Sequence, residues 1–255
     1  MNTIAWKQKV ARRFNDAATT YDAAAAIQRH IATTLAENLK AIRLPSHPVV
    51  LEVGCGTGFL TEQLAPVLHP ALWHATDIAP SMVQACLRRM QPHAINLNGR
   101  CMDGEWPDLP PQSVDLVVSN MTAQWFSDCP TALRRLYSLL RPGGILTMTL
   151  PGSQTFAEWR SLCSQTGMQT PTPLGPNRDT LAINLPYARI SAHKVPMHCA
   201  NLFEFLDHLR HTGARTAPQQ AAPMAVSQMR RLIRITQGHP LIMTYEVLTV
   251  IWSRL

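Results

Sequence analysis

The chain has 255 residues, a length that suits one α/β domain with some elaboration or two small domains. Its hydrophobic content of 46% allows a sizeable core, and no apolar run approaches the roughly 18–20 residues that a membrane-spanning helix needs. The basic N-terminus lacks a long apolar segment and a convincing cleavage site, which argues against a secretory signal. We therefore expect no membrane association and a cytoplasmic location.

The net charge of +7 is carried mainly by arginine, because only four of the 23 basic residues are lysine. Guanidinium groups bind carboxylates and phosphates well, so the excess favours an anionic substrate or an acidic partner. From composition alone, a solvated basic surface without a specific role explains the positive charge equally well. The six cysteines form no CxxC pair and are irregularly spaced, which predicts free thiols in a reducing compartment and no metal site.

Apolar periodicity predicts a first helix over residues 22–42, where Ile27, Ile31 and Leu35 recur every four residues and Asp22 is placed to cap it. Further helices are expected after Gly58 and at 80–90, 130–144, 201–212 and 225–236. Strands are expected at 49–53, 71–77, 114–120, 144–150 and 243–255, with one more before 101. Alternating strands and helices predict βαβ units and a mostly parallel sheet covered on both faces. Residues 165–187, rich in proline, glycine and polar residues, are interpreted as a lid or loop excursion.

Three glycines follow the first strand, at every second position of VLEVGCGTGFL (50–60). Gly54, Gly56 and Gly58 permit positive φ and a close approach of a ligand to the backbone. A dinucleotide site usually has G-x-G-x-x-G and a pyrophosphate at a helix N-terminus. G-x-G-x-G also suits a nucleoside cofactor without phosphates, which needs room for an amino acid and a ribose. Asp77, at the end of the second strand, is expected to accept hydrogen bonds from ribose hydroxyls in either class.

Two more segments favour the second class of cofactor. Asp103 lies in CMDGEWP (101–107), where its carboxylate can accept a hydrogen bond from the exocyclic amine of adenine. Asn120 lies at the end of a strand in VVSNMTAQW (117–125). Together with LEVGCGTGFL, ATDIAPSM and LRPGGIL, these segments resemble the class I S-adenosylmethionine-dependent methyltransferases over about residues 48–150. The resemblance implies a Rossmann-like α/β fold with a seven-stranded, mostly parallel sheet whose last strand is antiparallel.

The same resemblance implies a set of cofactor contacts at the carboxyl ends of the strands. These are Glu52, Gly54, Cys55, Gly56, Gly58, Asp77, Ile78, Met82, Asp103, Gly104 and Asn120. It also implies an organisation as a single methyltransferase domain, 1–255. Its parts are an N-terminal helical flap (1–45), a cofactor-binding core (46–152), a lid with substrate-facing helices (153–240) and a C-terminal strand (241–255).

The flanks resemble the malonyl-carrier-protein O-methyltransferases of biotin synthesis. The matching segments are VARRFNDAATTYDAAAAIQRH, NMTAQWFSD, FLDHLRHTGA and LIMTYEVLTVI. This resemblance implies methyl transfer from S-adenosylmethionine to the free carboxylate of a malonyl thioester, on acyl carrier protein or coenzyme A. It assigns Tyr21, Gln124 and Trp125 to catalysis and Tyr21, His30, Trp125 and Arg210 to substrate binding. Arg134, Arg135 and Arg141, expected on one helix, are candidates for docking an acidic carrier or its phosphopantetheine phosphate.

Other functions stay open from sequence alone. The core motifs also suit methylation of another small acid or of a quinone-type ring. A nucleic-acid methyltransferase is disfavoured, because the Pro-Pro-aromatic clamp of amino-methylating enzymes is replaced by SNMTAQW. A cofactor-binding protein without activity is disfavoured by the intact glycines and by Asp77 and Asp103. We expect no nucleic-acid partner, and a monomer is favoured.

Overall fold

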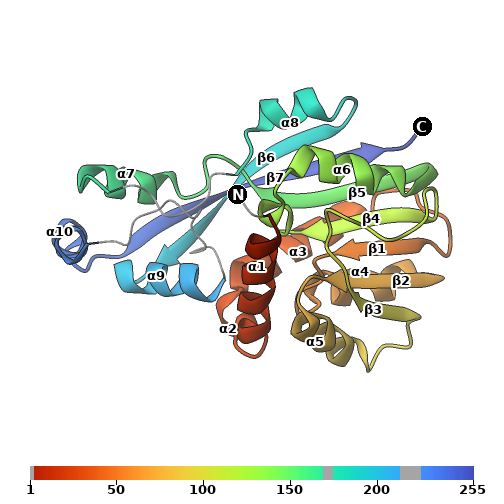
Figure 1. Ribbon diagram of the computed structural model, residues 1–255, viewed down its shortest axis with the longest axis horizontal. Helices are drawn as coiled ribbons and strands as arrows, with labels where there is room; N and C mark the ends of the chain where they lie inside the picture. The colour runs from red at the N-terminus through yellow and green to blue at the C-terminus, as the bar shows by residue number, and fades with distance from the viewer. Residues whose placement is uncertain (1–2, 169–174, 213–224) are drawn as a thin grey trace.

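The computed structural model describes residues 3–168, 175–212 and 225–255, and their architecture is built on one seven-stranded sheet of order β3-β2-β1-β4-β5-β7-β6 (Figure 1). The strands are β1 (Val49–Val53), β2 (Leu72–Asp77), β3 (Leu97–Cys101), β4 (Val114–Asn120), β5 (Leu140–Pro151), β6 (Arg189–Cys199) and β7 (Leu241–Ser253). The first five strands are parallel, and β7 runs antiparallel between β5 and β6. The expected α/β fold with an antiparallel last strand is confirmed.

Helices cover both faces of the sheet because successive strand residues point to opposite sides. Val50 and Val118 face one cluster of buried side chains, whereas Leu51 and Val117 face another. The helices are α1 (Thr3–Ala17), α2 (Tyr21–Ala24), α3 (Ala26–Leu39), α4 (Phe59–Leu68), α5 (Pro80–Met90), α6 (Cys129–Ser138), α7 (Ala157–Gln165), α8 (Arg178–Asn184), α9 (Leu202–His211) and α10 (Val226–Thr236), with a short 3₁₀ turn at Ala123–Trp125. Helices α3, α4 and α5 contribute to the first cluster, and α6 and α8 to the second. None of these described helices is long and apolar enough to cross a membrane.

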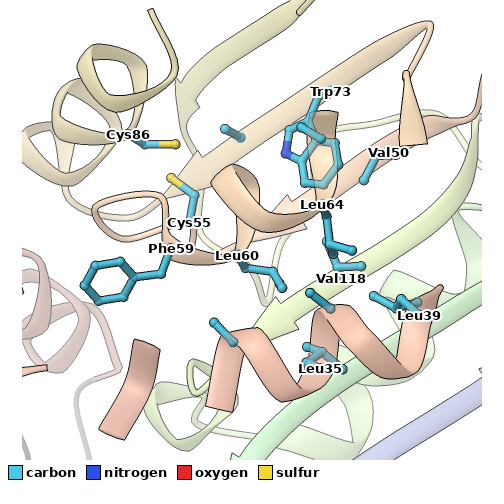
Figure 2. Close-up of a cluster of buried hydrophobic side chains, with 14 of the residues drawn as sticks. Leu35, Leu39, Val50, Cys55, Phe59, Leu60, Leu64, Trp73, Cys86 and Val118 are labelled. Atoms are coloured by element: carbon cyan, nitrogen blue, oxygen red, sulfur yellow. The ribbon is translucent and has the colours of Figure 1, made fainter. Parts of the chain in front are cut away.

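Figure 2 shows how the first cluster fixes the glycine-rich loop. Leu35 of α3 and Leu60 and Leu64 of α4 interdigitate beneath β1 and β4, and all three leucines are buried. Burial of each such side chain stabilises the fold by roughly 1.5–3 kcal/mol. The start of α4 is therefore held firmly against the sheet, and so is the loop that joins β1 to α4.

The sheet order reverses between β1 and β4, since β2 and β3 lie on one side of β1 and β4 and β5 on the other. In open parallel sheets, ligands bind at such a switch point, beyond the carboxyl ends of the strands. The loop that contains Gly54, Gly56 and Gly58 lies at this point, directly after β1.

Several expected elements differ in the structure. Asp22 does not cap α3: it lies in α2 and forms an ion pair with Arg89. The helix expected to reach residue 144 ends at Ser138, because β5 already begins at Leu140, so Arg141 lies on a strand instead of sharing a helix with Arg134 and Arg135.

The region after β5 contains more regular structure than the sequence predicted. Helix α7 and the whole of β6 were not expected, and the segment 165–187 contains the helix α8. The interpretation of that segment as a lid or loop was therefore wrong for α8, while residues 169–174 lie outside the described part of the chain.

Candidate active site

A single cavity at the switch point collects most of the predicted site residues. Its empty space, including the opening to solvent, is about 920 Å³. The predicted residues that line it are Tyr21, Glu52, Gly54, Cys55, Gly56, Asp77, Ile78, Met82, Asp103, Gly104, Asn120, Gln124 and Trp125. They come from the ends of four neighbouring strands and from the N-terminal helices, so the topology gathers them as expected for a ligand site.

Two glycines of the loop after β1 show why side chains are absent there. Gly54 has φ of +70°, and a Cβ on it would lie 2.2 Å from Oγ1 of Thr122. Gly56 has φ of +53° with nothing within 4 Å of the Cβ position, so its backbone borders open space. Both positions favour glycine for its conformational freedom, and Gly56 in addition exposes backbone to the cavity.

Asp77 ties the end of β2 to this loop. Its Oδ2 accepts a hydrogen bond from the amide of Gly56 at 3.0 Å and its Oδ1 from the amide of Ala79 at 2.9 Å. Burial raises the pKa of Asp77 to about 6, and these amide donors oppose the rise. Each oxygen can accept a further hydrogen bond, so the carboxylate remains able to bind the hydroxyls of a ligand in the cavity that it lines.

Glu52 lies deeper, beneath the loop. Its Oε2 accepts hydrogen bonds from Oγ1 of Thr61 at 2.6 Å and from Nε1 of Trp73 at 3.0 Å. The side chain is almost fully buried, and burial raises its pKa to about 7. Glu52 therefore joins β1, α4 and β2 as well as contributing an acid to the cavity wall.

Cys55, between the first two glycines, also lines the cavity and is buried. Its sulfur lies toward that of Cys86 on α5 (Figure 2). Hydrogen bonding with Cys86 and burial both raise the pKa of the Cys55 thiol well above its usual value. The side chain is therefore a neutral thiol at physiological pH.

The charge of the cavity wall is acidic. Glu52, Asp77 and Asp103 line it, and Lys7 is the one cation among the described lining residues. Nζ of Lys7 lies 2.9 Å from Oδ1 of Asp103 and 2.5 Å from Oε2 of Glu105, so its charge is already neutralised. A pyrophosphate would face carboxylates here, whereas a cationic ligand suits the wall.

Aromatic side chains cover the cavity from the N-terminal side. Phe14 lies 5.5 Å from the ring of Trp125 and 6.2 Å from that of Tyr21, and Tyr21 stacks on Phe59 at 6.4 Å. Burial and, secondarily, the charge of Asp77 raise the pKa of Tyr21, so the phenol stays protonated and can donate a hydrogen bond. The N-terminal helices thus supply an apolar cover with one polar group in it.

Three buried polar atoms of lining residues have no hydrogen-bond partner within the described structure. They are Oε1 of Gln28, Oγ1 of Thr57 and Oε1 of Gln124. Nε2 of Gln124 already donates to the carbonyl of Met121 at 2.6 Å, so only the oxygen of this amide is left for a ligand. Because buried polar groups are nearly always hydrogen-bonded, these atoms indicate a ligand with several donor groups.

The remaining predicted residues lie elsewhere. Gly58 starts α4 behind the cavity wall, 3.1 Å from Sγ of Cys86 as measured from its Cβ position. His30 is exposed on α3, because it lies about 200° around the helix from Gln28, which does line the cavity. Arg210 is also exposed, near the end of α9, and lines a different cavity. The structure therefore gives no support to a role for His30 or Arg210 at the substrate carboxylate.

Sequence reasoning missed several lining residues. They are Lys7, Val10, Phe14, Gln28, Thr57, Phe59, Leu60, Met102, Thr122, Phe126 and Thr212, with Val53 and Met121. Gln28 could have been predicted, because it lies in the segment VARRFNDAATTYDAAAAIQRH, which resembles the family. Lys7 is one of only four lysines, but no local pattern links it to Asp103.

Comparison with known proteins identifies the family. Residues 50–144 match the family model described as a methyltransferase domain. The chain is 36% identical to malonyl-[acyl-carrier protein] O-methyltransferase of Magnetococcus marinus, over 93% of this chain and 89% of that protein. This chain belongs to the malonyl-[acyl-carrier protein] O-methyltransferase family.

Other relatives within the malonyl-[acyl-carrier protein] O-methyltransferase family extend the match. The protein of that name from Bacillus anthracis is 28% identical over 95% of each chain. The biotin biosynthesis bifunctional protein BioCD of Bordetella avium is 36% identical over 97% of this chain, which spans about half of that protein, 52%.

Solved structures agree on the fold. The YcgJ protein of Bacillus subtilis has a TM-score of 0.63 at 13% identity, over 87% of this chain and 97% of its own. Phosphoethanolamine N-methyltransferase 2 of Haemonchus contortus, solved with S-adenosylhomocysteine, has a TM-score of 0.55 at 14% identity, over 86% of this chain and 52% of its own. At these identities the likeness shows the shared methyltransferase fold.

Proposed function

We propose that this chain transfers a methyl group from S-adenosylmethionine to the free carboxylate of a malonyl thioester held by an acyl carrier protein. The observation that carries the proposal is 36% identity, over nearly the full length of both chains, to a malonyl-[acyl-carrier protein] O-methyltransferase. The acidic, partly apolar cavity at the switch point supports the choice of methyl donor. As proposed, the protein acts on thioester intermediates of biosynthesis in the cytoplasm.

The residues of the cavity fit S-adenosylmethionine. Asp77 has acceptor capacity for ribose hydroxyls, and Ile78 and Met102 offer apolar walls to an adenine beside Asp103. The unpartnered oxygens of Thr57 and Gln124 suit the ammonium group and hydroxyls of such a ligand. When bound, S-adenosylmethionine would supply an electrophilic methyl group, which a carboxylate oxygen can attack while the neutral sulfide S-adenosylhomocysteine leaves.

The chain has little acid–base work to do in this reaction. A malonyl carboxylate is ionised at neutral pH, so no side chain has to remove a proton. The titratable groups of the cavity are accordingly engaged or neutral. Lys7 forms an ion pair with Asp103, and Asp77 accepts hydrogen bonds from two backbone amides. Tyr21 remains a protonated phenol. The expected contribution of the protein is alignment, and holding reactants about 3–3.5 Å apart in line is worth ~7–11 kcal/mol.

The described cavity wall contains no unneutralised cation to hold the carboxylate. This suits the chemistry, because a cation and an anion react to give neutral groups. A strong ion pair to the carboxylate would stabilise the reactants more than the transition state and slow the transfer. We therefore assign carboxylate binding to neutral donors, the phenol of Tyr21 and the indole of Trp125, with Gln28 beside them.

The N-terminal helices exclude water from the site. Nζ of Lys7 bonds to Asp103 and Glu105, and Oδ1 of Asn15 accepts the amide of Ser81 at 2.9 Å. These contacts fasten α1 over the cavity. We propose that residues 1–45 act in this way as a flap on the core formed by 46–152, and that the dry cover strengthens the reactivity of the carboxylate.

The product is chemically useful to an acyl carrier pathway. Esterification removes the charge of the malonyl carboxylate, so its methyl ester resembles a neutral acyl chain. Enzymes that extend neutral acyl thioesters can then accept it as a primer, which agrees with the biotin biosynthesis named for the relative from Bordetella avium.

The proposal is tested by incubating the full chain with S-adenosylmethionine and malonyl-carrier protein and analysing the acyl group by mass spectrometry. We expect the mass gain of one CH₂ on the malonyl group and none on acetyl-carrier protein, which has no free carboxylate. Tyr21→Phe should reduce kcat for malonyl methylation while retaining S-adenosylmethionine binding. Methylation of another small acid or of a quinone ring, with none on malonyl thioesters, would favour the alternative function and reject this one.

A further inference from the structure

A second, basic cavity adjoins the active site. It is lined by the C-terminal half of α1 and the end of α9, and we call it the entrance cavity. Its lining residues are Arg13, Phe14, Asp16, Ala17, Thr20, Arg210 and His211. Of these residues, only Arg210 was assigned a role from the sequence, in substrate binding.

The entrance cavity and the active-site cavity share a wall. Phe14 lines both of them. Thr212 lines the active-site cavity, and its neighbour His211 lines the entrance cavity. The two cavities therefore adjoin at Phe14.

The charge of the entrance cavity is opposite to that of the active site. Arg13 and Arg210 contribute two guanidinium groups, against the single carboxylate of Asp16. Nδ1 of His211 bonds to the carbonyl of Asp207 at 2.8 Å, which holds the ring in place. Each guanidinium group presents a planar fork of N–H donors that binds phosphate well, and this cavity has one from α1 and one from α9.

We propose that the entrance cavity binds the phosphate of the phosphopantetheine arm of the thioester substrate. The inference rests on the proposed function, in which the acyl group must reach a buried site at the end of that arm. The phosphate and the acyl group lie at opposite ends of the arm, as the basic and the acidic cavity lie on opposite sides of Phe14. This assignment gives Arg210 a contact with substrate, at its phosphate instead of its carboxylate.

The arginines first considered for this role lie on other surfaces. The guanidinium of Arg135 stacks on the ring of Trp106 at 3.6 Å, and that of Arg141 bonds to Asp115 at 2.8 Å. Arg134 bonds to the hydroxyl of Thr131 at 2.9 Å. None of these three arginines lines the active-site cavity or the entrance cavity in the described part of the chain. Arg13 and Arg210 line the entrance cavity and are therefore the better candidates for binding the phosphate.

The test compares two thioesters that differ only in the phosphate, malonyl-phosphopantetheine and malonyl-pantetheine. For the wild-type chain we expect kcat/KM to be about tenfold higher with the phosphate, mainly through KM. The double variant Arg13→Ala/Arg210→Ala should bring this ratio close to one. Arg43→Ala, which removes an exposed arginine near the opposite, amino end of β1, is the matched control and should keep the wild-type ratio. Calorimetric titration with phosphopantetheine and pantetheine gives the same comparison for binding alone.

The outcomes separate the inference from the function on which it rests. A wild-type ratio near one, or a ratio that the double variant leaves unchanged, would overturn the role of the entrance cavity while methyl transfer itself stands. Absence of methyl transfer to both thioesters would overturn the proposed function instead. If thermal unfolding shows that the double variant is unstable, Arg210→Lys, which keeps the charge but loses the fork, should lower the ratio in its place.

Discussion

The buried carboxyl group of Glu52 makes the stability of the protein depend on pH in a way that one substitution should remove. Both of its hydrogen-bond donors, Thr61 and Trp73, bond to the same oxygen, Oε2. Glu52→Gln can therefore keep a carbonyl oxygen at that position and remove the charge, with an NH₂ group in place of Oε1. The variant should be more stable than the wild type wherever the wild-type carboxyl group is ionised.

The magnitude and sign follow from the raised pKa. Burial raises the pKa of Glu52 from 4.5 to about 7; at about 1.36 kcal/mol for each pH unit this corresponds to ~3 kcal/mol. Below pH 4.5 the group is protonated in both states. Between pH 4.5 and 7 the unfolded chain releases a proton that the folded chain retains, so the free energy of unfolding falls as pH rises, and the loss is complete above about pH 7.

Urea unfolding of the ligand-free protein at several pH values between 4.5 and 8 measures this difference. The advantage of Glu52→Gln over the wild type should grow with pH by ~3 kcal/mol and level off above pH 7. Glu37→Gln, at an exposed position on α3 paired with Lys40, is the control and should show no such trend. An advantage that stays constant with pH, or that shrinks as pH rises, would refute the reasoning.

Three further predictions concern the loop, the flap and a buried histidine. Gly54→Ala combines backbone strain at φ of +70° with a steric overlap on Thr122, whereas Gly143→Ala has the positive φ alone. Gly54→Ala should therefore lower the free energy of unfolding by ~1–3 kcal/mol more than Gly143→Ala does. Equal losses in the two variants would contradict this. Lys7→Met removes the ion pairs that fasten α1 and should weaken S-adenosylmethionine binding about tenfold by calorimetry; an unchanged Kd would argue against the flap. Burial lowers the pKa of His208 to about 4, so its contribution to stability is present above pH 6.5 and is lost as pH falls toward 4; His208→Gln should reduce the acid sensitivity of unfolding, and an unchanged pH profile would exclude this source.

The cofactor half of the fold was predictable because β1, β2 and β4 are short and almost entirely buried. The edge strand β6 was not, because four successive residues, 191–194, interrupt its alternation of exposed and buried side chains and because it includes Pro196. Proline lacks the N–H for a strand ladder and normally argues against a strand. It is tolerated here because β6 is the last strand of the sheet, with β7 on one side only. Whether a strand lies at the edge depends on the assembled sheet and cannot be predicted from the local sequence.

The candidate site divides in a similar way. Residues that directly follow strands, such as Asp77 and Asp103, were predictable because the carboxyl ends of parallel strands meet at one edge. Lys7 and Phe14 were not, since their place depends on how α1 packs across that edge. Gln28 was not predicted either, because helical periodicity marks the buried face of α3 but does not show which residues of that face line the cavity.

The neutral state of the thiol at Cys55 has a consequence for a protein that handles a reactive methyl donor. A thiolate is a far better nucleophile than a thiol, and this sulfur lies in the wall of the proposed cofactor site. Contact with Cys86 and burial keep it protonated, and burial does the same for the phenol of Tyr21. Neither the thiol nor the phenol is therefore an effective nucleophile toward the methyl group of the proposed donor.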